Sequence, residues 1–343
     1  MSVPVIAFFN NKGGVGKTTL VYHLSWAFAD LGRNVLVADL DPQANLTKFF
    51  LDEDSLEELW PDGPREKTLY GCVEPLIRGI GDIPDEPYTI DIDQQLHLLP
   101  GDLDLSRFEE ELSRQWPLCL DKDERAFLII SAFWRIMQFA AKKTCVEIIL
   151  IDMGPNLGAI NRSALISVDF LVVPIIPDRF CLHDLKNIGA TVRRWRDEWE
   201  EHRKRNPKGE PILPKGRINP LGYVVMQHAV RADRPVKAYE RWVSRIPEIY
   251  TEEVLGKELS GLDAIFKDDS NRLGLIKHYR SLMPMSMEAH KPMFHLQPAD
   301  GAIGSHYHAV QEAGKNFTQL AEEIEKRYKE MLWSLKERKN RNK

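Results

Sequence analysis

The stretch that decides the fold is Val3 to Leu40, which reads VPVIAFFNNKGGVGKTTLVYHLSWAFADLGRNVLVADL. It opens with an apolar run at 3–9, passes through a glycine-rich loop at 10–16, and continues with apolar residues at helical spacing over 17–31. A second apolar run follows at 34–40. Short continuous apolar runs are typical of parallel strands that are covered on both faces. The stretch therefore predicts a right-handed unit of strand, loop, helix and strand.

The same alternation returns later in the chain. Apolar runs predict strands at 147–153, 169–175 and 221–226, and residues 182–199 carry one apolar face of a long helix. A last helix is predicted at 306–335 by apolar residues spaced three, four and seven apart. The fold class is therefore α/β, with a mostly parallel, doubly wound sheet and helices on both of its faces.

Other parts of the chain are less regular. Residues 51–93 are acidic and contain many prolines and glycines, so we expect an irregular insertion there. A strand is predicted at 96–99 and helices at 103–112 and 124–143, while the polar residues 202–217 predict an exposed loop. We expect one domain over residues 1–325, followed by a basic tail over 326–343 with eight Lys or Arg and two Glu.

Composition excludes several classes of protein. The 343 residues hold 46 basic and 51 acidic side chains, a net charge of −5, so any contact with nucleic acid or membrane must use a local basic patch. The four cysteines form no CxxC pair, which argues against a zinc knuckle and a disulfide framework. No stretch approaches the roughly 18 apolar residues of a spanning helix. We expect a cytoplasmic protein.

Residues 11–19, NKGGVGKTT, carry the parts of a phosphate site. Gly13, Gly14 and Gly16 can adopt backbone angles that turn amide N–H groups inward around phosphate oxygens. Lys17 would reach the β- and γ-phosphates, and Thr18 would offer its hydroxyl to Mg²⁺. The following helix would point its positive end at the anion. The alternative is a glycine-rich structural turn with coincidental lysines.

Residues 12–18 resemble the deviant Walker A motif, KGGxGK[ST], of the ParA/MinD family of P-loop ATPases. This resemblance implies a P-loop NTPase type of sheet and the cofactors ATP and Mg²⁺. It also implies that Lys12 crosses a dimer interface to the phosphates of the partner's ATP, the alternative being a merely solubilising charge. The residues expected to bind the nucleotide in this loop are Asn11, Lys12, Gly13, Gly14, Val15, Gly16, Lys17, Thr18 and Thr19.

Three further segments are similar to the same family. Residues 39–45, DLDPQAN, resemble its switch I, which implies that Asp41 orients the attacking water and that Asp39 lies near the Mg²⁺ shell. An ordinary helix N-cap is the alternative for Asp41. Residues 148–152 resemble a Walker B strand, whose Asp152 would hold Mg²⁺ directly or through water. The implied metal residues are thus Thr18, Asp39 and Asp152, and the implied catalytic residues are Lys12, Lys17 and Asp41. Residues 172–178 resemble the segment that borders the base pocket and dimer face, so Pro177 and Asp178 are further nucleotide-binding candidates.

The resemblance implies a slow ATPase whose ATP-bound homodimer binds DNA without sequence preference and is reset when a partner protein stimulates hydrolysis. Its role would be DNA segregation or cargo positioning, in association with the nucleoid. The candidate DNA-binding residues are Arg193, Arg194, Arg203, Lys204 and Arg205. Acidic residues at 197–201 leave the alternative of a solvated helix with internal ion pairs.

Three other functions remain open at this stage. One is a regulatory ATPase that controls an effector protein. Another is a MinD-like ATPase that uses the basic, amphipathic residues 326–343 on a membrane, although burial of their apolar side chains explains them without one. A metabolic P-loop ligase or kinase would require a cluster of acid and base groups, and none is evident.

Overall fold

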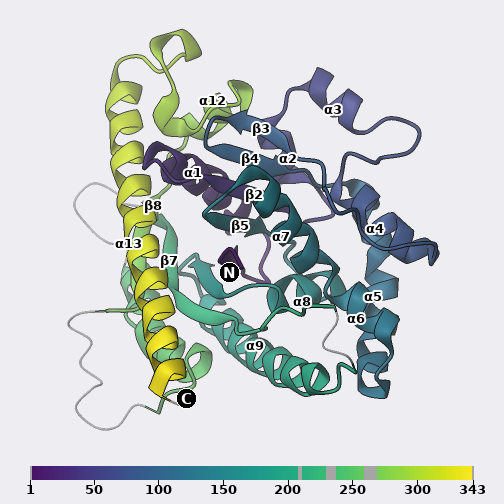
Figure 1. The fold of residues 1–343 in the computed structure, drawn as a ribbon. Coiled ribbons are helices and arrows are strands. Elements are labelled where there is room, and N and C mark those ends of the chain that lie inside the picture. The colour runs from purple at the N-terminus through teal and green to yellow at the C-terminus, as the bar shows by residue number, and fades with distance from the viewer. Residues whose placement is uncertain (1, 208–210, 229–236, 259–268, 342–343) are drawn as a thin grey trace.

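A computed structural model describes residues 2–207, 211–228, 237–258 and 269–341. Eight strands form one sheet in the order β3, β4, β2, β5, β1, β6, β7, β8 (Figure 1). The edge strand β3 runs antiparallel to β4, and every other neighbouring pair is parallel. The predicted fold class, an α/β protein with a mostly parallel sheet, is confirmed.

Six of the eight strands coincide with predicted apolar runs, and the two edge strands, β3 and β8, were not predicted. The strands are β1 (Val5–Phe8), β2 (Val35–Asp39), β3 (Ile90–Asp93), β4 (Leu96–Leu99), β5 (Ile148–Asp152), β6 (Phe170–Ile175), β7 (Asn219–His228) and β8 (Arg272–Lys277). Strands β1, β2, β5 and β6 are buried along their whole length. This burial on both faces explains why they lack the polar alternation of a surface strand.

Helices cover both faces of the sheet. In β1, Val5 and Ala7 belong to one hydrophobic core, whereas Ile6 and Phe8 belong to the other. The first core is closed by α4 (Leu69–Arg78), α5 (Phe108–Leu118), α6 (Glu124–Ile130), α7 (Ala132–Thr144), α8 (Ala159–Ile166), α9 (Cys181–Lys204) and α11 (Ile246–Ile249). The second is closed by α1 (Lys17–Asp30), α2 (Asn45–Phe50), α3 (Glu53–Leu59), α12 (Leu282–Glu288) and α13 (Ser305–Arg341). The alternation of side chains along each strand thus supplies two cores from one sheet.

The remaining elements are short. They are α10 (Lys237–Val243), the single turns Leu103–Arg107, Cys119–Asp121, Met293–His295 and Pro298–Asp300, and the π-helical turn Tyr250–Val254.

The prediction of an irregular segment at 51–93 is wrong, because α3, α4 and β3 lie within it. Asp52 and Thr68 start the two helices by accepting hydrogen bonds from Ser55 N and Gly71 N. Gly71 lies inside α4, where a Cβ would come within 2.3 Å of the Arg65 carbonyl oxygen. This glycine therefore marks a close backbone approach within a helix, whereas glycine in the sequence alone suggests a turn.

Two predicted boundaries also need correction. The loop predicted at 202–217 begins later, because α9 continues to Lys204. The basic residues 326–341 form the last turns of α13, so they continue the preceding helix. Arg327 pairs with Glu323 and Lys329 pairs with Glu325, which shows how this helix compensates part of its positive charge internally.

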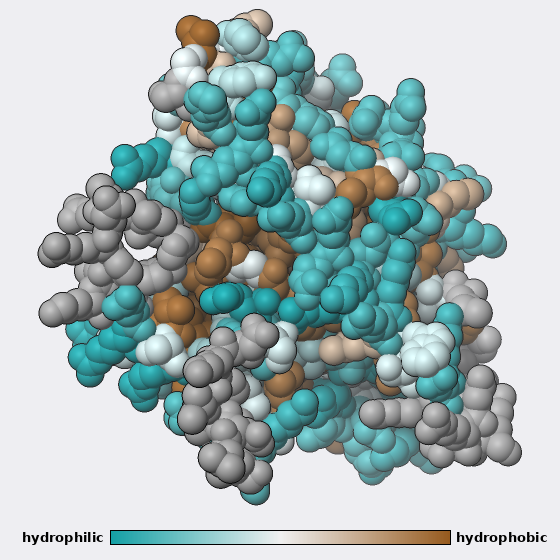
Figure 2. Space-filling view, turned by 90° about the vertical axis from the view of Figure 1, so that its left-hand side faces the viewer, coloured by the Kyte–Doolittle hydropathy of each residue, from teal (hydrophilic) through white to brown (hydrophobic). Residues whose placement is uncertain are grey.

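Figure 2 looks onto the side of the molecule that carries α13 and β8, and shows hydrophobic residues in a hollow framed by hydrophilic ones. Among the described helices, none combines the length and the apolar character that crossing a bilayer requires. In the described part of the chain, no three His, Cys, Asp or Glu side chains cluster in a way that could hold a metal ion.

Candidate functional site

The carboxyl end of β1 opens into a cavity of about 250 Å³. Its wall is formed by the glycine-rich loop, the start of α1 and the turn after β2, and it includes Gly13, Gly14, Gly16, Lys17, Thr18, Thr19, Asp41, Gln43 and Asn45. Gly14 and Gly16 have φ angles of 72° and 84°, in the left-handed region that favours glycine. No side chain caps the first turn of α1, so its N–H groups and positive helix end remain available to an anion.

Lys17 brings a positive charge to this cavity. It is the first residue of α1, only 7% of it is exposed, and its Nζ donates to the Lys12 carbonyl oxygen at 3.2 Å. Burial lowers the pKa of Lys17, while the carboxylates of Asp152 and Asp41 oppose that shift. A lysine held partly out of water is well placed to exchange this single carbonyl for phosphate oxygens.

Asp152, at the end of β5, is a buried carboxylate that the chain leaves unsatisfied. Neither oxygen has a hydrogen-bond partner of normal geometry among the described residues, although the Thr18 hydroxyl is close enough to lower its pKa. Burial and the neighbouring Asp39 carboxylate raise the pKa of Asp152 above its ordinary value. Bare carboxylate oxygens beside a hydroxyl are the donor set that Mg²⁺ takes. Thr18 and Asp152 therefore fit the predicted metal site.

Asp39 differs from Asp152, its register partner on the adjacent strand. Its Oδ2 accepts hydrogen bonds from the N–H and the hydroxyl of Thr47, both at 2.8 Å, and its Oδ1 accepts from Asp41 N at 3.3 Å. The Thr47 hydroxyl in turn accepts from Gly101 N at 2.9 Å. With both oxygens engaged by the chain, Asp39 ties the start of α2 to the sheet, and the structure does not present it as a direct metal ligand.

Asp41 faces the cavity from the turn after β2. Its Oδ1 accepts a hydrogen bond from Gln43 N at 3.0 Å, and helix α2 has Ala44 as its N-cap, so the alternative that Asp41 caps this helix is wrong. A Cβ on Gly154 would lie 3.3 Å from this same Asp41 oxygen. The turn after β5 therefore approaches Asp41 closely enough to favour glycine at 154.

Lys12 does not line the phosphate cavity. Its ammonium pairs with the Asp178 carboxylate and lies 5.8 Å from the centre of the exposed Phe180 ring. Asp178 also accepts hydrogen bonds from Phe180 N at 2.9 Å and Cys181 N at 3.0 Å. Against the effect of partial burial, Lys12 and these N–H groups lower the pKa of Asp178. Neither Pro177 nor Asp178 lines the phosphate cavity, because the chain here turns into α9.

A second, smaller cavity of about 120 Å³ adjoins the first and shares Gly16 and Thr19 with it. Its other walls come from α1, β7, β8, α12 and α13, and include Val15, Met226, Ile276, His278, Tyr279, Met283, Met293 and Phe317. An apolar cavity beside a phosphate site suits a flat base. Met226 lies at the end of the strand predicted at 221–226. The sequence did not bring Ile276, Tyr279 and Phe317 together with it, because their elements converge only in the folded chain.

Sequence reasoning also missed two residues that hold the site in place. Asn10 donates to the Pro174 carbonyl at 2.8 Å and accepts from Lys12 N at 3.0 Å, which fastens the loop to β6. Glu109 accepts hydrogen bonds from Ala159 N and Ile160 N, and so fixes the start of α8 after the turn that contacts Asp41. Asparagine after the first strand was a visible signal, while Glu109 resembles any exposed helical acid in sequence.

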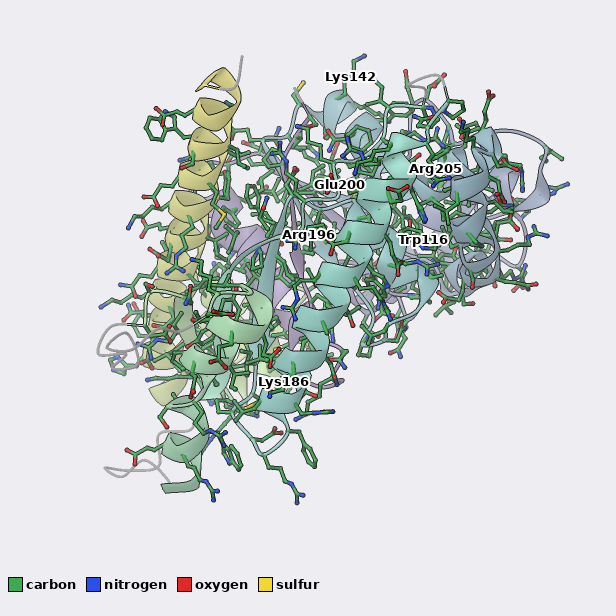
Figure 3. All side chains as sticks on the ribbon, turned by 90° about the horizontal axis from the view of Figure 1, so that it is seen from below. Trp116, Lys142, Lys186, Arg196, Glu200 and Arg205 are labelled. Atoms are coloured by element: carbon green, nitrogen blue, oxygen red, sulfur yellow. The ribbon has the colours of Figure 1, made fainter. Side chains whose placement is uncertain are left out.

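Each predicted DNA-binding cation has a partner within the chain. Arg194 lies 3.8 Å from Glu198, Lys204 3.5 Å from Glu200 and Arg205 3.1 Å from Glu201. Arg193 donates to the Glu253 carbonyl, and Arg203 donates to the Lys215 carbonyl at 3.2 Å. Figure 3 shows Lys186, Arg196, Glu200 and Arg205 along α9, so cations and acids share this helix. The structure thus supports the ion-paired helix that the acidic residues at 197–201 suggested.

The parallel sheet, the glycine-rich turn from β1 to α1 and the buried acid at the end of β5 define a P-loop nucleotide-binding fold. Residues 3–204 match the family model described as AAA domain. The chain belongs to this family, and within it to the ParA/MinD P-loop ATPases.

Individual relatives agree with this assignment. A putative replication protein A of Rhizobium rhizogenes is 33% identical over 182 residues, which are 50% of this chain and 40% of the relative. A probable plasmid-partitioning protein ParA of Thermus thermophilus is 29% identical over 205 residues, 60% of this chain and 54% of the relative. The match thus spans about half of each of these proteins. The crystal structure of protein DIP2308 from Corynebacterium diphtheriae is 28% identical, with a TM-score of 0.67, over 84% of this chain and 97% of that one.

Proposed function

We propose that this chain is an ATP-driven switch that hydrolyses Mg·ATP slowly, dimerises in the ATP state and serves in DNA segregation or cargo positioning. The observation that carries the proposal is that Lys17, Thr18 and Asp41 line the cavity at the end of β1, with the unsatisfied carboxylate of Asp152 buried directly beside Thr18. The name of the Thermus thermophilus relative, a plasmid-partitioning protein, favours the cellular role.

In the proposed reaction, the N–H groups of the glycine-rich loop and of the first turn of α1 bind the phosphates. Thr18 and Asp152 would hold Mg²⁺, which neutralises charge on the phosphate oxygens when it is bound. Lys17 donates to the terminal phosphates, and Asp41 holds and orients the attacking water. Asp39 acts through Thr47 as a positioning residue, because both of its oxygens are engaged by the chain.

Lys12 is the residue through which a second subunit would act. In the single chain its ammonium pairs with Asp178, and Lys12 is absent from the lining of the phosphate cavity. Both side chains are partly exposed, and an exposed ion pair contributes only about 0–1 kcal/mol. Lys12 can therefore leave Asp178 for a phosphate of the partner subunit's ATP at little loss of stability. A cation supplied in trans can accelerate phosphoryl transfer by about 10³–10⁵. Dimerisation would thereby switch hydrolysis on.

DNA binding would use exposed cations of α9. The pairs Arg194–Glu198, Lys204–Glu200 and Arg205–Glu201 join neighbouring turns of the helix, and their side chains are largely in water. Such pairs are weak, so DNA phosphates can replace the carboxylates. Because this contact releases counterions, retention on DNA should fall steeply as salt rises.

The experiment is sedimentation of the chain and its Asp41→Ala variant with and without ATP, Mg²⁺ and duplex DNA, at two salt concentrations. We expect Asp41→Ala to bind ATP normally and to accumulate as a dimer, because hydrolysis no longer resets it. A monomeric Asp41→Ala variant in saturating ATP would refute the dimer switch. Lys12→Ala is the matched comparison: it should bind ATP normally while turnover falls by about 10³.

The DNA part of the proposal has its own test. The triple variant Arg203→Glu, Lys204→Glu and Arg205→Glu should lose salt-sensitive retention on duplex DNA and still form the ATP dimer. Unchanged retention would remove this end of α9 from the interface. Partner-stimulated ATP turnover without any retention on DNA would instead favour the regulatory ATPase.

A further inference from the structure

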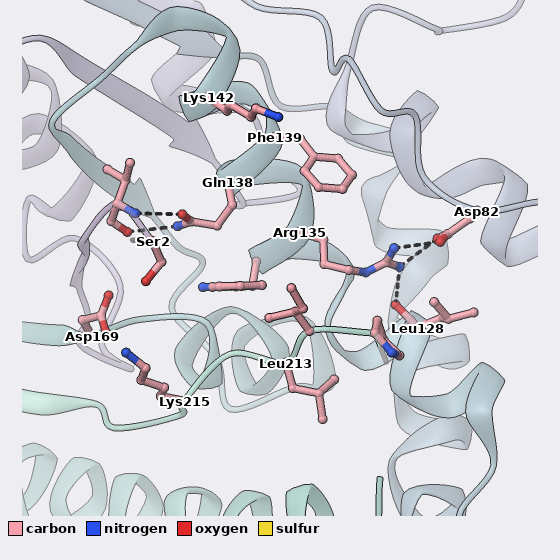
Figure 4. Close-up of a pocket in the computed structure, with 14 residues that line it drawn as sticks. Ser2, Asp82, Leu128, Arg135, Gln138, Phe139, Lys142, Asp169, Leu213 and Lys215 are labelled. Atoms are coloured by element: carbon pink, nitrogen blue, oxygen red, sulfur yellow. Dashed lines mark hydrogen bonds and ion pairs between the residues drawn. The ribbon is translucent and has the colours of Figure 1, made fainter. Parts of the chain in front are cut away.

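A cavity of about 860 Å³ opens at the opposite end of the sheet, near the amino ends of β1 and β6 (Figure 4). Its walls come from the start of the chain, from α7, and from the segment 211–215 that follows α9. This volume lies within the range of about 300–1,000 Å³ in which proteins bind small molecules. None of the proposed roles in nucleotide binding uses it.

The frame of this cavity is preformed. Arg135 makes a two-pronged contact with Asp82 at 2.7 and 2.8 Å and also donates to the Leu128 carbonyl at 2.8 Å. Gln138 holds both backbone groups of Val3, accepting from its N–H at 2.8 Å and donating to its carbonyl at 3.0 Å. These bonds hold the Arg135 and Gln138 side chains in place without a ligand, so this part of the wall needs no occupant in order to persist.

A second part of the lining is apolar and partly open to solvent. Trp134, Phe139, Leu128 and Leu213 are neither fully buried nor fully exposed, and Ile212 is 65% exposed. Two aromatic rings with aliphatic neighbours provide a surface for a flat or aliphatic body. Exposed apolar side chains gathered around a cavity commonly mark a binding site.

Charge decides which kind of molecule fits. The lining holds three cations, Arg135, Lys142 and Lys215, and two acids, Asp82 and Asp169. Asp82 is paired with Arg135. Burial raises the pKa of Asp169, and the positive charge of nearby Lys215 opposes that shift. Lys142 has no hydrogen-bond or ion-pair partner for its ammonium among the residues that the structure describes. Figure 4 shows Lys142 and Phe139 together on one side of the cavity. One positive charge thus remains uncompensated beside an aromatic surface.

We propose that this cavity binds a small amphipathic monoanion, with its apolar or aromatic body against Trp134, Phe139 and Leu213 and its carboxylate, sulfonate or similar anionic group on Lys142. The site is separate from the nucleotide site, since the two cavities share no lining residue. Strands β1 and β6 connect the two ends of the molecule, because Gln138 holds Val3 ahead of β1, and β6 leads from Asp169 to Asp178.

The test uses anilinonaphthalene sulfonate, a fluorescent aromatic monoanion, on the full chain, together with phenylnaphthylamine, its counterpart without the sulfonate. We expect one bound sulfonate probe per chain, displaced by naphthoate and not by Mg·ATP. Lys142→Glu should weaken the sulfonate probe about tenfold, because a charge-assisted contact is replaced by repulsion. Its effect on the neutral probe should stay within about twofold.

The matched control is Lys143→Glu, because Lys143 is also exposed at the end of α7 and does not line the cavity. It should leave both probes unchanged within about twofold. A second variant, Ile212→Asp, places a carboxylate at an exposed position of the lining and should also weaken the sulfonate probe selectively.

Three results would overturn the proposal: displacement of the sulfonate probe by Mg·ATP, equal effects of Lys142→Glu and Lys143→Glu, or equal losses of the charged and neutral probes in Lys142→Glu. A chain that fails to bind ATP leaves this test intact, so failure of the proposed ATPase and failure of this site are distinguishable.

Discussion

The polar side chains at the two ends of the central strands differ in how fully they are hydrogen-bonded within the chain. At the carboxyl end, the Asp152 oxygens lack well-formed partners, α1 begins without a side-chain cap, and Lys17 donates to a single carbonyl. At the amino end, Arg135 and Gln138 are hydrogen-bonded to Asp82, Leu128 and Val3. Unsatisfied buried groups cost stability, so Asp152 and the uncapped start of α1 indicate that a charged ligand completes the carboxyl end. We therefore expect mutations at the two ends to affect different quantities.

The largest effect is expected for Lys17→Ala at the carboxyl end. Charge-assisted hydrogen bonds contribute about 1.5–3 kcal/mol, so ATP affinity should fall by about 100-fold, as measured by titration calorimetry. Stability without nucleotide should change little, because a desolvated lysine is removed together with its single bond. Normal ATP affinity in this variant would show that the carboxyl end of the strands is not the ATP site.

A smaller and opposite effect is expected for Arg135→Ala at the amino end. This guanidinium is buried and bonded to Asp82, Leu128 and Ser131, so its loss should lower the free energy of unfolding by about 2 kcal/mol in urea denaturation. ATP affinity should stay the same. Arg78→Ala is the control, since Arg78 is exposed and only weakly paired with Glu74, and it should cost less than about 0.5 kcal/mol. A loss of ATP binding in Arg135→Ala would show that the two ends are not separable.

The smallest effect is expected for Asp152→Asn, and it should be stabilising without nucleotide. Burial raises the pKa of Asp152, so the folded chain keeps a proton that the unfolded chain loses, and stability falls as pH rises above the ordinary aspartate value. The variant lacks this loss, so its unfolding free energy should exceed that of the natural chain by about 1 kcal/mol near neutral pH and by less near pH 4.

Thermal melts across this pH range measure the difference, and the exposed Asp85→Asn serves as control. With Mg·ATP present the order should reverse, because the natural chain gains more from its ligand. If the variant melts at a lower temperature than the natural chain at neutral pH without nucleotide, the buried Asp152 carboxyl group does not destabilise the free protein.

The sequence predicts the central strands and the phosphate loop well because their signals are local. The strand residues 5–8, 35–38 and 148–151 are apolar throughout, and the loop chemistry lies within nine consecutive residues. The two edge strands, β3 (IDID) and β8 (RLGLIK), were not predicted. Their residues are only partly buried, so polar and apolar side chains are mixed and no continuous apolar run forms. Helix α4 was not predicted because Gly71 indicates the end of a helix in sequence. The reason for this glycine, the close approach of the Arg65 backbone, is visible only in the folded chain.

The candidate site divides in the same way. Lys17, Thr18 and Asp152 belong to motifs that can be read along the chain. The pairing of Lys12 with Asp178 joins residues 166 positions apart, and the satisfied state of Asp39 depends on Thr47 and on Gly101 in another loop. These contacts decide which predicted residues face a ligand and which are held by the protein, and no local spacing encodes them.

Helix α13 connects the small cavity beside the glycine-rich loop to a distant part of the surface, so a ligand in that cavity can move the far end of the helix. Phe317 lines that cavity and stacks on His23 of α1 with 4.9 Å between ring centres. The helix has 37 residues, so at 1.5 Å per residue it is about 55 Å long. From Phe317 to its end the helix spans about 36 Å, so a tilt of about 5° caused by a bound base would move that end by about 3 Å. We expect the distance between spin labels at the exposed positions 143 and 334 to change when nucleotide binds. An unchanged distance would mean that the helix does not tilt.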